Sequence, residues 1–201
     1  MKPLESRIYL EVLTIASILL ALGPATYQRN LVWKSETSLW LDVVKKVPWN
    51  DRAYVNLGNE HLKNHLWNEA IAEFKKAIEI NPRRYSGYYD LAIAYEGKGM
   101  LDEAIEHYQK ALNIKPDLLE AITNLGTIYL QKDQLDAATT QYKRALNIKP
   151  DLPEAHWNLG LAYEKKGLVR EAIREFEDYL RLRPGDAPMA IARINKLQTF
   201  H

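Results

Sequence analysis

Apolar and small residues recur along the chain at helical spacing, and the same order of residues returns every 34 positions. Prolines mark this period at Pro48, Pro82, Pro116, Pro150 and Pro184. Four columns show it most clearly: Leu57, Leu91, Leu125 and Leu159; Gly58, Ala92, Gly126 and Gly160; Ala70, Ala104, Ala138 and Ala172; Phe74, Tyr108, Tyr142 and Phe176. A fixed period in this range indicates stacked supersecondary units.

Within one period the pattern predicts two helices. Leu125, Ile128 and Tyr129 share one helical face, and Ala138 and Tyr142 share another. The recurring proline ends the second helix, because it lacks a backbone donor and disfavours helical geometry in the residue before it. Neither helix can bury its apolar face alone, so we expect the units to be stabilised by stacking on their neighbours.

The turn between the two helices is expected to need a left-handed backbone. Gly99 and Gly167 stand at this position in the second and fourth units, where a helix commonly ends with a positive φ. His65 and Asp133 stand at the same position in the other two units, so we expect some backbone strain there.

The repeating pattern resembles the tetratricopeptide-repeat (TPR) family. The resemblance is strongest at Asn124-Leu125-Gly126 with Tyr129 and at Asn158-Leu159-Gly160 with Tyr163. It implies an all-α, right-handed superhelix whose concave face is lined by the first helix of each pair. The expected units are 51–84, 85–118, 119–152 and 153–186.

Both ends of this array carry a segment that can cover its exposed core. Residues 31–50 are interpreted as a linker and a half-repeat helix, in which Trp40 and Val43 take the place of core residues. Residues 187–201 are interpreted as a capping helix, because Ala190, Ile194 and Leu197 form an apolar stripe at helical spacing.

Residues 1–30 do not fit a solenoid. The chain has 16 consecutive uncharged residues from Val12 to Tyr27, and the apolar character extends over about 8–27. Roughly 20 apolar residues span a bilayer core, so we predict an N-terminal hydrophobic helix that crosses a membrane. Two alternatives stay open: a cleaved secretory signal and a helix buried in protein. Basic residues flank both sides, so charge does not fix the orientation.

A second resemblance lies at the junction of this segment with the repeats. Arg29-Asn30-Leu31-Val32-Trp33, followed by Glu36 and Leu39-Trp40, is similar to the junction in O-mannosyltransferase-type (TMTC-like) multispanning membrane proteins, which carry C-terminal tetratricopeptide arrays. It implies that this single-pass chain holds its repeats on the non-cytoplasmic side. The many membrane helices and acidic catalytic loops of such enzymes are not in this sequence.

Composition narrows the chemistry further. Of 201 residues, 27 are Lys or Arg and 26 are Asp or Glu, so the net charge of +1 does not favour nucleic-acid binding. The chain has no cysteine, which excludes disulfides and thiolate metal sites. No phosphate loop or catalytic motif occurs, and His107, His156 and His201 suggest no ligand set. We therefore expect no catalytic residues, metal ion, cofactor, nucleic acid or small-molecule substrate.

The concave face is the candidate binding site. Helical spacing predicts that it presents Asn56, Asn59, Tyr89, Asp90, Ile93, Thr123, Asn124, Thr127, Trp157, Asn158 and Leu161. An amide side chain offers both a donor and an acceptor, so a row of asparagines can bind the backbone of an extended peptide. Aromatic side chains add apolar contact area, as at recognition hot spots. Alternatively, these asparagines cap or brace neighbouring helices.

Two functional hypotheses follow. The first is a membrane-tethered scaffold or adaptor, not an enzyme, that holds an extended segment of a partner protein in the groove. The second is an acceptor-binding C-terminal part of a membrane glycosyltransferase whose catalytic part is not in this chain.

Overall fold

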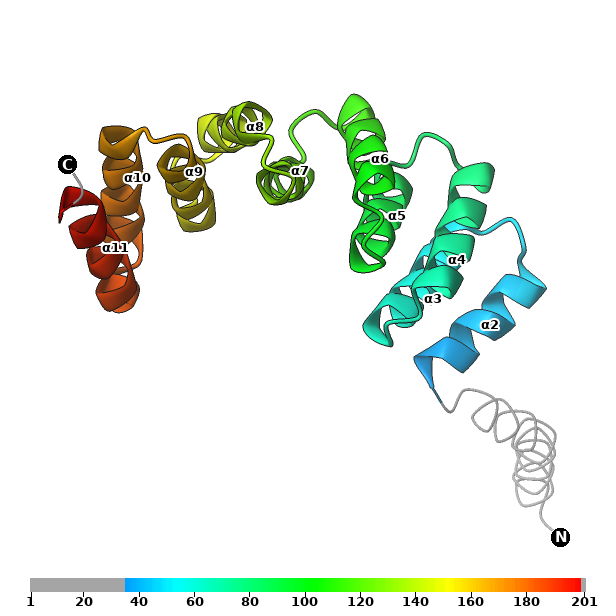
Figure 1. The fold of residues 1–201 in the computed structure, drawn as a ribbon. Coiled ribbons are helices and arrows are strands. Elements are labelled where there is room, and N and C mark those ends of the chain that lie inside the picture. The colour runs from blue at the N-terminus through cyan, green and yellow to red at the C-terminus, as the bar shows by residue number, and fades with distance from the viewer. Residues whose placement is uncertain (1–34, 200–201) are drawn as a thin grey trace, which may run out of the picture.

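The computed structural model describes residues 35–199, and this part of the chain contains helices and no strands. The helices form one curved row with α2 and α11 at opposite ends (Figure 1). They are α2 (Glu36–Lys46), α3 (Asp51–Lys63), α4 (Trp67–Ile80), α5 (Tyr85–Gly97), α6 (Leu101–Ile114), α7 (Leu119–Gln131), α8 (Leu135–Ile148), α9 (Pro153–Lys165), α10 (Val169–Leu182), the short 3-10 helix η1 (Pro184–Asp186) and α11 (Ala187–Thr199). The all-α repeat architecture expected from the 34-residue period is therefore present.

The N-terminal prediction falls on another part of the chain. The expected hydrophobic helix in 1–30, with its membrane span at about 8–27, lies outside the described residues. Between residues 35 and 199, no helix combines the length and the apolar character that a bilayer crossing requires.

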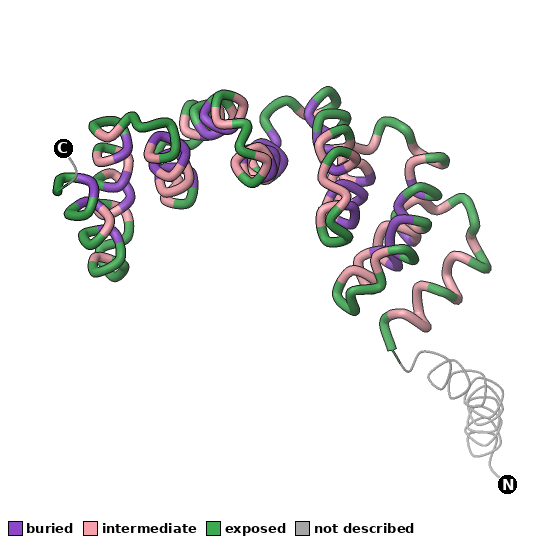
Figure 2. The backbone as a smooth tube through the Cα atoms, viewed as in Figure 1, coloured by how far each residue is buried: buried purple, intermediate pink, exposed green. Residues whose placement is uncertain are grey.

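Each pair of helices packs through an aromatic ring of the second helix against a small residue of the first. Phe74, Tyr108, Tyr142 and Phe176 are all fully buried. A Cβ atom added to Gly126 would lie 2.8 Å from the Tyr142 ring, so the ring rests directly on the α7 backbone. Figure 2 shows buried residues in every helix pair of the row from α3 to α10 and in α11.

The turns inside the units have the left-handed backbone that the sequence predicts. Gly99 and Gly167 have φ values of 80° and 73°, and His65 and Asp133 both have a φ of 57°. In each turn the chain reverses direction within a few residues, so α4, α6, α8 and α10 pack back against the helix before them.

The two terminal helices differ in how far they are buried. On α11, Ala190, Ile194 and Leu197 are buried against the last unit, as expected of a capping helix. On α2 no residue is buried, and Trp40 and Val43 are half-exposed. The physical reason is that α2 makes its main contacts with α3, so most of its outer side has no neighbour within residues 35–199.

Candidate peptide-binding groove

The predicted groove residues lie on the first helices of the four units. These helices, α3, α5, α7 and α9, occupy the inner side of the curve (Figure 1), and α3 also contacts α5, as α7 contacts α9. All 11 predicted residues are half-buried, which is the exposure expected of side chains that line an open concave surface. The predicted residues therefore lie on helices of the inner side and are partly accessible to a ligand.

We call the position held by Asn56, Asp90, Asn124 and Asn158 in successive units the asparagine column. Its side chains differ in their hydrogen bonds. Asn124 donates from Nδ2 to the Tyr108 hydroxyl at 3.0 Å, and that hydroxyl donates to Glu96 Oε2 at 2.7 Å. Burial, followed by the charge of Glu96, raises the pKa of Tyr108, so the phenol stays protonated and the chain of hydrogen bonds is fixed. Asn124 braces α7 against α6, and its side chain also interacts with Tyr89, so it has little hydrogen-bonding capacity left for a ligand.

The amides of Asn56 and Asn158, at the two ends of the column, differ from that of Asn124 in having no hydrogen-bond partner among the described residues. In the stretch from residue 35 to 199, no side chain or backbone group hydrogen bonds the side-chain amide of Asn56 or Asn158. Both amides are half-buried. A half-buried amide without a protein partner retains its donor and its acceptor for a ligand.

Asp90 occupies the asparagine position in the second unit. Burial raises the pKa of Asp90 to about 7. No hydrogen bond or ion pair reaches its carboxyl group from the described residues. A protonated carboxyl group carries one O–H donor and one carbonyl acceptor, so below about pH 7 this side chain offers a donor and an acceptor as the asparagines do.

The two threonines are satisfied within their own helices. Thr123 donates from Oγ1 to the Leu119 carbonyl at 3.0 Å, and Thr127 donates to the Thr123 carbonyl at 3.1 Å. Thr127 Oγ1 also accepts from the Tyr142 hydroxyl at 3.2 Å. They shape the centre of the groove and leave little hydrogen-bonding capacity for a ligand.

The aromatic groove residues pack against rings of the second helices. The ring centroids of Tyr89 and Tyr108 are 5.7 Å apart, and the ring centroid of Trp157 lies 5.0 Å from those of both Phe176 and Tyr179. Such packing fixes the orientation of each ring, so its exposed face is preorganised for contact.

Two hollows end the groove, and both include groove residues. The first measures about 530 Å³ and lies between α2 and α3. It is lined by Glu36, Leu39, Trp40, Asn56, Asn59, Glu60, Leu62 and Lys63. Lys63 Nζ lies 3.3 Å from Glu36 Oε2 and also pairs with Glu60, so this hollow has charged walls.

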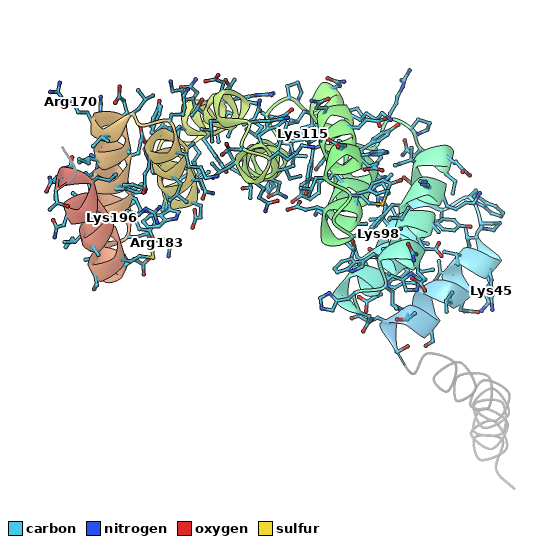
Figure 3. The ribbon with its side chains drawn as sticks, viewed as in Figure 1. Lys45, Lys98, Lys115, Arg170, Arg183 and Lys196 are labelled. Carbon is cyan, nitrogen blue, oxygen red and sulfur yellow. The ribbon has the colours of Figure 1, made fainter. Side chains whose placement is uncertain are left out.

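The second hollow, about 290 Å³, lies at the C-terminal end. It is lined by Glu154, Trp157, Asn158, Tyr179, Arg183, Asp186 and Met189. Arg183 pairs with Glu154 at 3.1 Å, and Tyr179 donates to Asp186 at 2.7 Å. Figure 3 shows Arg183 and Lys196 together at this end of the row.

Residues from α2, α10, η1 and α11 in these hollows were not among the sequence predictions. They lie outside the first helices, and the period identifies positions within a unit only. The signal that could have found them is the departure of the terminal segments from the repeat, since Asp186 and Met189 follow the last proline of the series.

Comparison with known proteins agrees with the helical-repeat fold. Models of the TPR repeat and the tetratricopeptide repeat match residues 126–167 and 153–186. The crystal structure of MamA is 30% identical to the chain, with a TM-score of 0.70 over 74% of this chain and 87% of that one. The chain belongs to the tetratricopeptide-repeat family. A model described as regulator of microtubule dynamics protein 1-3 also matches residues 38–124 of this TPR protein.

Two further TPR structures share the fold. YrrB, described as a TPR protein with an unusual peptide-binding site, is 22% identical over 80% of this chain and 82% of its own, with a TM-score of 0.70. A thermophilic TPR protein of Thermus thermophilus is 25% identical over 91% of this chain and 98% of its own, with a TM-score of 0.60. No curated protein matches the sequence. The resemblance to O-mannosyltransferase-type proteins stays a prediction.

Proposed function

We propose that this TPR protein is a membrane-tethered scaffold or adaptor whose concave face holds an extended segment of a partner polypeptide. The observation that carries the proposal is the pair of half-buried amides at Asn56 and Asn158, which no group in residues 35–199 satisfies. They stand at the two ends of one surface, and the hollows beside them offer room for side chains of the ligand. YrrB, with the same fold, is described as having a peptide-binding site.

The proposed mechanism is binding alone. Asn56, Asp90 and Asn158 present hydrogen-bonding groups to a peptide backbone, which is the same for every sequence. Trp157 contributes apolar area where the second hollow opens. Specificity comes from the charged and apolar walls of the two hollows, since these contact side chains of the ligand.

The direct test is selection of unstructured peptides from a displayed random library on the folded chain. We expect Asn56→Ala with Asn158→Ala to weaken binding of the selected peptides by about tenfold or more, because each lost hydrogen bond costs about 0.5–1.5 kcal/mol. Affinity is measured by fluorescence anisotropy, and helicity by circular dichroism.

Asn113→Ala with Asn147→Ala is the matched control. These two asparagines also lie one period apart, at the ends of α6 and α8, and both are exposed. Their replacement should leave peptide affinity unchanged. If both double variants bind as tightly as the original chain, the groove is not the binding site.

Membrane tethering rests on the uncharged stretch from Val12 to Tyr27, with the repeats proposed to lie on the non-cytoplasmic side. A spanning helix keeps the chain in the pellet during carbonate extraction, whereas release to the supernatant argues against the tether.

The glycosyltransferase alternative uses the same groove and rests on the resemblance around residues 29–40. This alternative predicts that the chain copurifies with a multispanning membrane protein that carries the catalytic part.

A further inference from the structure

A cluster of possible metal ligands lies in the fourth unit, apart from the asparagine column. His156 on α9 and Glu175 and Asp178 on α10 bring one ligand atom each to within 4.8 Å of one another. His156 is buried, and the two carboxylates are half-buried. From the sequence alone His156 suggests no ligand set, because its neighbours in the cluster follow it by about 20 residues on another helix.

The hydrogen bonds of His156 aim one nitrogen at the carboxylates. Nε2 lies 3.0 Å from the Pro150 carbonyl, which can only accept, so Nε2 carries a proton. Nδ1 lies 2.7 Å from Glu175 Oε2. Nδ1 and the carboxylate oxygen therefore face one another, and the space between them takes either a proton or a metal ion. Metal-bound histidines commonly donate their other N–H to a backbone carbonyl, as His156 does.

Comparison of the four units shows that this chemistry is specific to the last one. The position of His156 holds an aromatic or aliphatic residue in the other units, and the position of Asp178 holds a base in every one of them. In unit order the three columns read Tyr54, Tyr88, Ile122 and His156; Glu73, His107, Gln141 and Glu175; Lys76, Lys110, Arg144 and Asp178.

The second unit shows that the contact itself belongs to the repeat. There the equivalent rings of Tyr88 and His107 lie 6.5 Å apart. The backbone therefore brings these positions together in different units, and only the fourth unit fills all three with side chains that ligate metals. A salt bridge between His156 and Glu175 alone gives no reason for an acid at 178.

We propose that His156, Glu175 and Asp178 bind a divalent first-row transition metal ion, with zinc as the probe. One imidazole nitrogen and two carboxylate oxygens form a three-ligand set, to which water adds the remaining ligands. Ligand atoms about 2.1 Å from one ion lie at most about 4.2 Å apart, so the cluster needs only a small closure. Asp178 is paired at 2.8 Å with the exposed Arg181, a surface ion pair that costs little to release.

The test uses the whole chain, purified without a histidine tag and stripped with a chelator. Calorimetric titration with Zn²⁺ is expected to show one high-affinity ion per chain, and Co²⁺ to develop visible absorption bands at the same stoichiometry. Glu175→Gln keeps the shape of the side chain, and Asp178→Lys restores the charge found in the other units. Each should weaken Zn²⁺ binding at least about 10–100-fold, since even outer-shell partners carry that much affinity.

The control is Glu177→Gln, an exposed carboxylate between the two proposed ligands on α10. It should bind Zn²⁺ like the original chain. Absence of high-affinity Zn²⁺ binding by the original chain overturns the proposal. Equal affinity in Glu175→Gln, Asp178→Lys and the original chain also overturns it, since the ion then binds elsewhere. Either result leaves the peptide groove untouched, because the groove depends on other side chains.

Discussion

At the scale of single residues, the asparagine column shows how one position serves different purposes in different units. Asn124 braces Tyr108, whereas Asn56 and Asn158 keep their amides free of bonds from residues 35–199. Asp90 takes the same position with an acid, and burial raises its pKa to about 7. The folded chain therefore binds a proton there that an ordinary aspartate releases near its usual pKa of 3.8.

The raised pKa of Asp90 predicts a dependence of stability on pH. Between about pH 4 and 7 the folded state holds more protons than the unfolded state, so the Asp90 contribution to the free energy of unfolding falls as pH rises. Asp90→Asn removes this loss. We expect the variant to be more stable by about 1–3 kcal/mol at pH 8, with the difference vanishing near pH 4, given about 1.4 kcal/mol per pKa unit.

Urea unfolding at the two pH values measures this difference. Asp117→Asn serves as the control, because Asp117 is exposed and forms no ion pair with the residues described. A variant at position 90 that is no more stable than the original chain at pH 8 would show that Asp90 is well solvated.

The sequence could predict which residues share this face, because the period fixes their position in each helix. It could not predict that Asn124 would bond Tyr108. That contact joins residues 16 positions apart and depends on the packing angle between α6 and α7. The alternative that asparagines brace helices is correct for Asn124, and a residue pattern alone could not separate it from the free amides at 56 and 158.

At the scale of elements, the turn inside each unit depends on a single left-handed residue. Gly167 has a φ of 73°, and a Cβ added there would have no atom within 4 Å. Its conformation is therefore a requirement of the backbone alone. This explains why the turn was predictable from the sequence: the signal is local, whereas groove contacts and the His156 cluster depend on packing between helices.

Gly167→Ala should lower the free energy of unfolding by about 1–2 kcal/mol, the cost of a left-handed conformation for a residue with a Cβ. Gly185→Ala is the matched control, because Gly185 also has open space around it and no positive φ. It should be neutral or stabilising by up to about 1 kcal/mol, through the reduced freedom of the unfolded chain. Thermal and urea unfolding compare the two variants, and equal effects would contradict a backbone origin.

At the scale of the whole molecule, each helix packs mainly on its neighbours in the row, so the helices at the two ends have the fewest stabilising contacts. The period predicted the number and order of helix pairs. It could not predict that α2 would bury no residue while α11 buries three, because burial at the ends depends on what covers the outer side. Stability in such an array is approximately a sum of unit and interface terms, and damage at one end stays local.

This locality leads to a prediction for the capping helix α11. Ile194 and Ile191 lie one turn apart on it, with 8% and 44% of their surface exposed. Ile194→Ala removes contacts with the last core cluster and should cost about 2–4 kcal/mol of the free energy of unfolding, whereas Ile191→Ala should change it by less than about 0.5 kcal/mol.

Hydrogen exchange should show faster opening of α9, α10 and α11 in the Ile194→Ala variant, with α3 to α6 unchanged, because no contact of Ile194 reaches those helices. Faster exchange along the whole row would mean instead that residues 35–199 open as one cooperative unit, and the same measurement distinguishes the two outcomes.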